Sequence, residues 1–223
     1  MNFYRRVCIL SVAFICALSF VACSDDDDDD SSSGTSDTMV IATGEYAGHA
    51  YVDMGLSVMW ATCNLGGDIA SDYGDYYMWG ETISGRKCTA DSSITYKMDI
   101  DDIAGDATYD AATAEWGSSW RLPTKEEFDE LVSECSWKWT MVDSIYGYYV
   151  TADNGNSIFF AAAGACTDDQ IVYRSSSARR GYYWSSTPDP DDTKNAYYLY
   201  FYSGHYYTRS YYRYNGRFIR PVY

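Results

Sequence analysis

The clearest pattern of hydrophobic and polar positions is a helical stripe in the middle of the chain. Its apolar positions recur at i, i+3, i+4 and i+7, at Phe128, Leu131, Val132 and Cys135. Thr124 stands just before this stripe and can form a capping box with Glu127. We therefore predict a helix over residues 125–134. Residues 110–116, an aspartate followed by helix-favouring alanines, predict a second, short helix.

The second half of the chain carries strand patterns instead. Strands are predicted at residues 148–151, 157–161, 182–186, 195–202, 206–212 and 218–222. Asn154-Gly155 separates the first two and favours a tight hairpin turn. Ser203-Gly204 and Asn215-Gly216 separate the last three.

The first half has shorter apolar segments. Residues 45–64 predict a hairpin or paired short strands around Gly55, and residues 75–80 predict a short aromatic strand. Residues 81–105 contain serines, a glycine and an acidic patch, and they predict a long loop. Two early helices and a strand-rich second half predict one α+β domain over residues 41–223.

The chain begins with an apolar run that differs from everything after it. Arg5 and Arg6 precede the uncharged residues 7–22, as in an export signal. The run is short for a membrane-spanning helix, and six aspartates follow it rather than a basic cluster. Residues 18–23, LSFVAC, resemble a lipobox, which predicts cleavage of a signal peptide at residues 1–22 and lipidation of Cys23. The alternative is an ordinary cleaved signal in which Cys23 has no special role.

Residues 23–40 predict a disordered acidic tether, because this stretch has almost no apolar side chain to bury. Acids directly after a lipidated cysteine also resemble the surface-export signal of Bacteroidetes lipoproteins. We therefore expect an outer membrane lipoprotein that is exposed on the cell surface rather than retained in the periplasm. The lipid anchor predicts a membrane contact. The formal charge of −16 argues against nucleic acid as a partner.

Four cysteines follow the tether, and all are disulfide candidates: Cys63, Cys88, Cys135 and Cys166. An even number in an oxidising compartment favours one or two structural disulfides, whose pairing the sequence leaves open. The chain has no CxxC pair and only two histidines, which argues against a zinc or redox site. We expect no metal and no cofactor.

Six segments carry a resemblance to a known family. They are GLSVMWATCNLG (55–66), YGDYYMWGET (73–82), WRLPTKEEFDEL (120–131), NGNSIFFAAAG (154–164), YYWSST (182–187) and GRFIRPV (216–222). In this order they resemble the Fibrobacter succinogenes major paralogous domain. That family looks like a branch of the C-type-lectin-like superfamily, which implies two helices packed on short mixed or antiparallel sheets.

The resemblance says little about activity, and no catalytic motif in the chain points to an enzyme. The RLPTxxE start of the helix is shared with formylglycine-generating enzymes, but their catalytic segment has no counterpart here. The EPN or QPD triplet and the WND motif of sugar-binding C-type lectins are missing, as are GxSxG and HExxH. The D-x-D spacing of one cluster could hold calcium, but a solvated acidic loop is the preferred interpretation of Asp99, Asp101, Asp102 and Asp106.

The chain ends in an unusual concentration of tyrosine. Nine of the 18 residues from Tyr197 to Tyr214 are tyrosine, interleaved with residue types that antibody paratopes also favour. Strand alternation predicts that Leu199 and Phe201 face inward with Tyr197, and that the opposite face is exposed. The expected ligand-binding residues are Tyr198, Tyr200, Tyr202, His205, Tyr206, Tyr207, Arg209, Tyr211, Tyr212, Tyr214 and Arg217. The competing interpretation is that about half of these rings are ordinary sheet packing.

Two functions follow from this tract. We expect a non-enzymatic module that presents the tyrosine face to a glycan, a peptide or a surface protein. The alternative is a structural or assembly component of a surface complex or fibre. The tract also resembles the target proteins of diversity-generating retroelements, which rewrite adenines in a C-terminal repeat.

Overall fold

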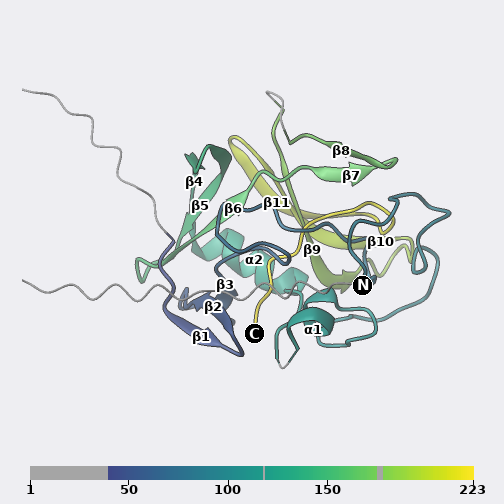
Figure 1. Ribbon diagram of the computed structural model, residues 1–223, viewed down its shortest axis with the longest axis horizontal. Coiled ribbons are helices and arrows are strands. Elements are labelled where there is room, and N and C mark those ends of the chain that lie inside the picture. Colours follow the sequence, from purple (N-terminus) through teal and green to yellow (C-terminus); the bar gives the residue numbers. More distant parts are fainter. Residues whose placement is uncertain (1–39, 118, 175–177) are drawn as a thin grey trace, which may run out of the picture. The chain divides into compact units, whose positions relative to one another are not determined.

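The computed structural model describes residues 40–117, 119–174 and 178–223, all within one contact unit, Asp37–Tyr223 (Figure 1). The predicted signal peptide, Cys23 and nearly all of the predicted tether lie outside the described residues. Within them, two helices accompany four small antiparallel sheets. The α+β class predicted from the sequence is confirmed.

The longer helix, α2, spans Lys125–Glu134, as predicted. Its capping box is complete, because the Glu127 amide donates to Thr124 Oγ1 at 3.2 Å and the Thr124 amide donates to Glu127 Oε2 at 2.8 Å. Phe128 and Leu131 are fully buried on the face of α2 that meets the core. Local sequence signals therefore set both the start of this helix and the face that it buries.

The shorter helix, α1, spans Ala111–Trp116 and is also where it was predicted. Asp110 caps it by accepting from the Thr113 amide at 3.1 Å. The same carboxylate accepts from the Leu122 amide at 2.9 Å. Burial raises the pKa of Asp110, and these amides oppose that effect. One capping residue thus also holds the chain that leads into α2.

The central sheet has the order β11-β10-β9, with β9 at Gly181–Pro188, β10 at Asn195–Tyr202 and β11 at His205–Tyr212. Leu199 and Phe201 of β10 pack in one hydrophobic cluster with the buried residues of α2. Tyr198 and Tyr200 point to the opposite face, as alternation predicted, but they are buried in a second cluster. The prediction that this second face is exposed is wrong, because other parts of the chain cover it.

Two further sheets lie on either side of α2 in the sequence. One has the order β4-β5-β6, with β4 at Ser136–Val142, β5 at Ile145–Thr151 and β6 at Ser157–Ala161. The β5–β6 hairpin was predicted, whereas β4 was not. The other sheet is formed by the short strands β1 (Gly44–Tyr46), β2 (His49–Val52) and β3 (Trp60–Ala61). As predicted, short strands pair around Gly55, because β2 and β3 are antiparallel on either side of it. β1 pairs with β2 through a tighter turn at Ala47-Gly48.

The fourth sheet is a small hairpin of β7 (Ala165–Thr167) and β8 (Gln170–Val172), which no sequence pattern predicted. In Figure 1 it lies at the edge of the domain beside β9 and β10. Residues 81–105 contain neither helix nor strand, as predicted.

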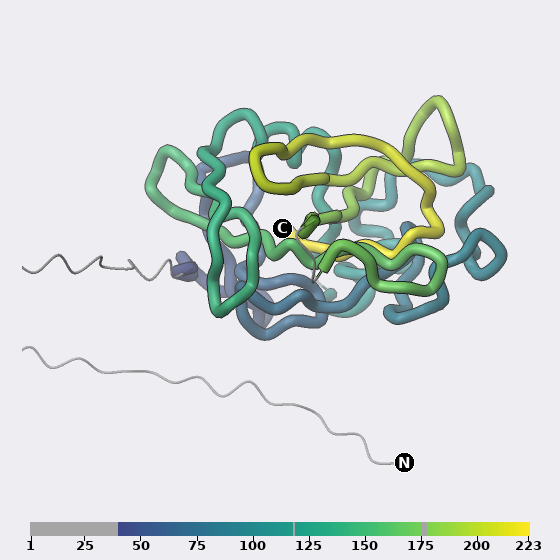
Figure 2. The backbone as a smooth tube through the Cα atoms, turned by 90° about the horizontal axis from the view of Figure 1, so that it is seen from above, coloured from purple at the N-terminus to yellow at the C-terminus, as the bar shows by residue number. Residues whose placement is uncertain are grey.

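The last residues of the chain, 213–223, form a C-terminal segment that is almost entirely buried. Figure 2 shows this segment, in yellow, running from β11 back into the body of the domain. It makes isolated bridges, among them Arg217 with Tyr77 and Phe218 with Tyr183. The predicted strands at 75–80 and 218–222 are therefore wrong. Most of their residues are buried, but each segment bridges to its partners only at single positions.

Candidate ligand-binding site

The predicted binding residues of β11 divide between its two faces. His205, Tyr207, Arg209 and Tyr211 are exposed and alternate with half-buried residues. Tyr206 lies on the opposite face, where its ring stacks on Trp137 with the centroids 4.6 Å apart. The prediction of an exposed Tyr206 is therefore wrong, since its face of β11 packs against the core.

The remaining predicted residues are less exposed than expected. Tyr198, Tyr200 and Arg217 are buried, and Tyr202 is half-buried. Tyr212 and Tyr214 are half-buried too, and they stack on each other and meet the ring of Tyr96 edge-on. Predicting all eleven as one exposed patch was wrong, because much of this aromatic surface is used for packing.

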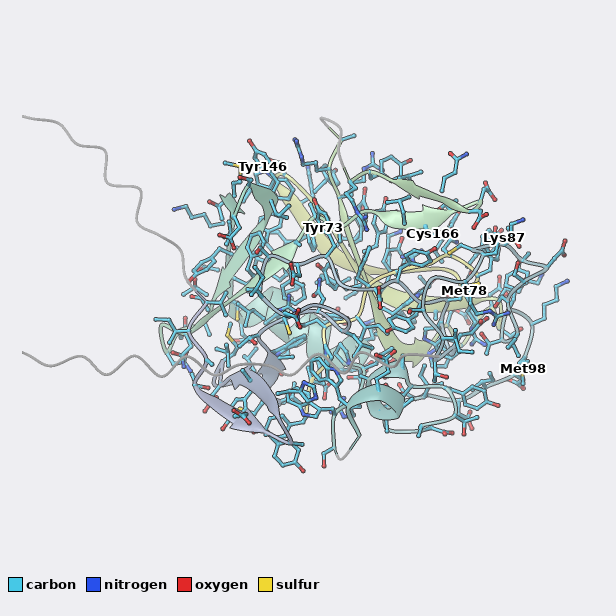
Figure 3. All side chains as sticks on the ribbon, viewed as in Figure 1. Tyr73, Met78, Lys87, Met98, Tyr146 and Cys166 are labelled. Carbon is cyan, nitrogen blue, oxygen red and sulfur yellow. The ribbon has the colours of Figure 1, made fainter. Side chains whose placement is uncertain are left out.

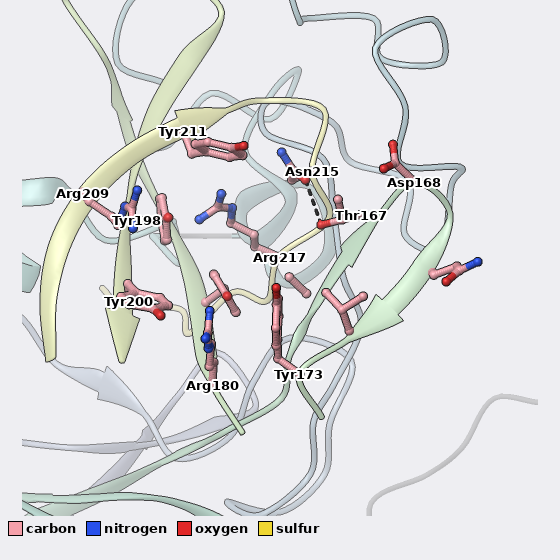
Figure 4. A pocket seen from close by; sticks show the side chains of 14 residues that line it. Thr167, Asp168, Tyr173, Arg180, Tyr198, Tyr200, Arg209, Tyr211, Asn215 and Arg217 are labelled. Atoms are coloured by element: carbon pink, nitrogen blue, oxygen red, sulfur yellow. Dashed lines mark hydrogen bonds between the residues drawn. The ribbon is translucent and has the colours of Figure 1, made fainter. Parts of the chain in front are cut away.

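Five of the eleven nevertheless line one cavity of 580 Å³: Tyr198, Tyr200, Arg209, Tyr211 and Arg217. The cavity, here called the tyrosine pocket, lies between the β7–β8 hairpin and the face of the central sheet that is opposite α2. Tyr173 adds a further ring and Arg180 a third arginine (Figure 4). Tyr182 also lines the cavity. The lining is therefore aromatic and cationic at once.

Sequence reasoning missed the side of the pocket that the β7–β8 hairpin supplies. Thr167 of β7 lies there and donates to Asn215 Oδ1 at 3.0 Å, a bond drawn in Figure 4. The hairpin turns at Asp168 and Asp169, which both adopt left-handed backbone conformations, with φ of 48° and 63°. Aspartate tolerates this conformation better than most residues, so this pair was the available sequence signal for the turn.

Comparison with known proteins gives a family for this chain. The model of the Lcl C-terminal domain family matches residues 50–223. The chain belongs to the Lcl C-terminal domain family. None of the curated proteins and none of the solved structures in the comparison matches it.

In this Lcl C-terminal domain, Arg217 forms the centre of the pocket wall. Its Cζ lies 3.2 Å from the ring centroid of Tyr198 and 4.2 Å from that of Trp184. The Arg217 backbone donates to and accepts from Tyr77 at 2.9 Å in both directions, which fixes its position. Burial lowers the pKa of Arg217. Within the described part of the chain, its Nε and Nη1 have no hydrogen-bond partner.

Two other buried arginines of the C-terminal segment have hydrogen-bond partners for their guanidinium groups. Arg220 donates to Asn64 Oδ1 at 2.9 Å and to the carbonyl oxygens of Ala61, Thr62 and Phe159. Arg213 donates to the carbonyl oxygens of Asn195 and Met98, and its Cζ lies 4.0 Å from the Trp79 ring centroid. Arg217 is equally buried and lacks such bonds at two of its nitrogens.

Arg180 and Arg209 are the other two cations of the pocket. The Cζ of Arg180 lies 4.3 Å from the Tyr173 ring centroid, and that of Arg209 lies 5.6 Å from the Tyr200 ring centroid. The salt bridges among the described residues are formed by Arg86, Arg121 and Lys125, so Arg180 and Arg209 take part in none of them. Asp168 is the one acid of the lining, and Figure 4 shows it at the far end from the three arginines.

The cysteines of the Lcl C-terminal domain are free thiols in this structure. Cys88 and Cys166 are buried in one small cluster with Met78, and the Cys88 thiol donates to the Arg86 carbonyl oxygen at 3.4 Å. Figure 3 shows Met78 and Cys166 on the same side of the domain. Cys63 and Cys135 are each partly exposed. The predicted disulfides stay a prediction, with Cys88 and Cys166 as one adjacent pair.

Acidic residues do not gather into a cation site in the described part of the chain. The four aspartates considered for calcium are exposed: Asp99, Asp101, Asp102 and Asp106. The described residues hold no group of three or more His, Cys, Asp or Glu side chains suited to a metal. They also include no helix with the length and apolar character needed to cross a membrane.

Proposed function

We propose that this chain is a non-enzymatic ligand-binding module, carried as a lipid-anchored outer membrane lipoprotein on the cell surface. The observation that carries the proposal is the tyrosine pocket, a 580 Å³ cavity walled by tyrosines and arginines. Cavities of roughly 300–1,000 Å³ are the usual size for small-molecule sites. The ligand is a small molecule or a terminal group of a glycan, a peptide or a surface protein.

The chemistry of the walls suits recognition. A tyrosine ring gives a large rigid contact area and a polar hydroxyl, and only two side-chain torsions are frozen on binding. Tyr211 is 44% exposed and forms part of the pocket, so a ligand can reach it without unfolding the sheet. Tyr182 and Tyr198 belong to the packed core, so the opposite wall is rigid before a ligand arrives.

The resemblance to the Fibrobacter succinogenes major paralogous domain, and through it to the C-type-lectin-like fold, supports the same proposal. Two helices packed with small antiparallel sheets are in line with that fold. We include this fold assignment in the proposal, with the tyrosine pocket as its ligand site.

Two tyrosines of β11 provide a matched test. Tyr211 and Tyr207 are on the same strand and face and are 44% and 41% exposed, but only Tyr211 lines the pocket. The labelled full-length chain is applied to glycan and peptide arrays. Tyr211→Ser should abolish capture, Tyr207→Ser should retain it, and both variants should melt close to the parent.

The other outcomes of this test are equally informative. Equal loss in both variants would favour the assembly component, whose interface is the flat face of β11 rather than the pocket. Capture that neither variant changes, or no capture by the parent, would contradict the proposal.

The likeness to retroelement target proteins can be tested on the same strand. Diversification of a folded domain requires positions that tolerate substitution, and these are the exposed residues His205, Tyr207, Arg209 and Tyr211. Sequencing of the gene from many sibling cells should show changes at these codons and constancy at Arg217, which is buried. Uniform sequence throughout would end this part of the proposal.

A further inference from the structure

Arg217 carries an inference about the ligand, which rests on the proposed function of the tyrosine pocket. Removing a cation from water is costly, and proteins normally offset this with an opposite charge or with hydrogen bonds. Arg220, three residues away, has four hydrogen bonds. Arg217 is 2% exposed and is stabilised mainly by the faces of Tyr198 and Trp184.

Arg217 also has another cation near it. Burial lowers the pKa of Arg217 and repulsion by Arg209 adds to this effect, whereas Tyr198 and Tyr182 oppose it. Arg180 lines the same cavity. Among the described residues none of the three arginines forms a salt bridge, although the chain has a formal charge of −16. The pocket is therefore a local positive site on an acidic protein, where an anion finds charges that the protein itself leaves uncompensated.

We propose that the tyrosine pocket binds a compact acid, a ring compound that carries one carboxylate. The carboxylate compensates the charge of Arg217 in the wall and accepts hydrogen bonds from Arg209 and Arg180. A carboxylate is planar, as a guanidinium is, and the two pair edge to edge. The ring of the ligand packs against the tyrosine walls, whose faces suit flat apolar surfaces.

The test compares two probes that differ in one substituent, which is a carboxylate in one and a neutral group in the other. Galacturonate and galactose share a ring, but galacturonate has a carboxylate where galactose has a hydroxymethyl group. Titration calorimetry with the full-length chain should detect binding of galacturonate and not of galactose. Salt should weaken this binding, because it screens the attraction between charges.

Two arginine variants test where the carboxylate binds, and a third variant is the control. Arg209→Gln alters an exposed side chain, and it should weaken galacturonate binding by about tenfold or more. Arg217→Met should abolish binding. Lys87→Gln removes a positive charge from an exposed residue that does not line the tyrosine pocket, so it is the control and should bind as the parent does. If Arg217→Met fails to fold, Arg209→Gln still decides the question.

Several results would overturn this inference. One such result is that galactose and galacturonate bind equally, and that this binding is unchanged in Arg209→Gln but lost in Tyr211→Ser. The proposed binding function would then stand, but the proposal that the ligand is an acid would be refuted. If inorganic sulfate or phosphate binds more tightly than any carboxylate, the proposal that the ligand's acidic group is a carboxylate is refuted. No binding of galacturonate, benzoate or other small ring acids would also refute it, while the array experiment judges the binding function separately.

Discussion

Arg217 and Arg220 are both buried in the C-terminal segment, but their side chains have different surroundings. Arg220 donates to carbonyl oxygens of the chain around β3 and of β6, and to Asn64 Oδ1. It thus joins segments that are far apart in the sequence. Arg217 is held mainly by aromatic rings and lines a cavity. The first arrangement favours stability, and the second favours binding.

This difference predicts unequal effects of the same substitution. Arg220→Met removes the donors of several buried acceptors and should lower the free energy of unfolding by about 3 kcal/mol. Arg217→Met places an apolar chain among aromatic rings and should cost less than about 1 kcal/mol. Urea unfolding of both variants measures the difference. A larger loss in Arg217→Met would show that Arg217 is a structural residue.

His49 predicts a dependence of stability on pH. Burial lowers the pKa of His49 below its ordinary value of 6.5, and its ring stacks on Trp116 with the centroids 3.8 Å apart. The unfolded chain therefore binds the proton more readily than the folded chain. The contribution of His49 to stability is complete above pH 6.5 and is lost as the pH falls through the lowered pKa.

Replacement by phenylalanine isolates this effect, because phenylalanine keeps a ring against Trp116 and does not titrate. Urea unfolding at about pH 7 and about pH 5 should show a smaller loss of stability in His49→Phe than in the parent. His205→Phe, at an exposed position of β11, is the control and should follow the parent. An identical loss in His49→Phe and the parent would rule out His49 as the source.

At the scale of elements, the sequence correctly predicted those helices and strands that local signals determine. The capping box and the apolar stripe determine α2, and the alternating pattern determines β10 to the residue. The pattern failed for residues 75–80 and 218–222, which are as apolar as strands. These segments are mostly buried, but they bridge to their neighbours only at single residues. Periodicity reports burial, whereas pairing depends on neighbours that are distant in sequence.

The cap of α2 can be tested by itself. Thr124→Ala leaves the Glu127 amide without its acceptor and should destabilise the domain by about 1 kcal/mol. Ser133→Ala changes an exposed hydroxyl in the last turn of the same helix and should have little effect. Thermal and urea unfolding provide the comparison. A Thr124→Ala variant as stable as the parent would mean that packing alone holds the helix start.

The candidate site was predictable only in part. The C-terminal tract supplied Tyr198, Tyr200, Arg209, Tyr211 and Arg217 to the pocket, so composition identified the correct region. It could not show which rings are buried, because the β7–β8 hairpin and the C-terminal segment cover one face of the central sheet. Such coverage is a property of the whole molecule, and no single strand encodes it.

The same hairpin gives a prediction at the scale of the whole molecule. Cys166 of β7 and Cys88 of the long loop are buried in one cluster, and the Cys166 and Gly216 backbones exchange hydrogen bonds of 2.8 and 2.9 Å. A side chain at Gly216 would come within 2.6 Å of Cys88 Sγ and 2.8 Å of Cys166 Cβ, so glycine permits this approach. Three distant segments therefore meet at one point beside the pocket wall.

We expect oxidised glutathione to convert this pair into a disulfide. The two thiols lose two electrons and two protons, and glutathione disulfide takes them up to become two glutathione thiols. Closing a loop of roughly 80 residues should raise the free energy of unfolding by about 4 kcal/mol. Peptide mass spectrometry should find Cys88 joined to Cys166, and Cys88→Ser should lose both the link and the added stability. A Cys63–Cys135 link in its place would show that the buried pair is not the one that oxidises, and that this corner of the domain is held by packing alone.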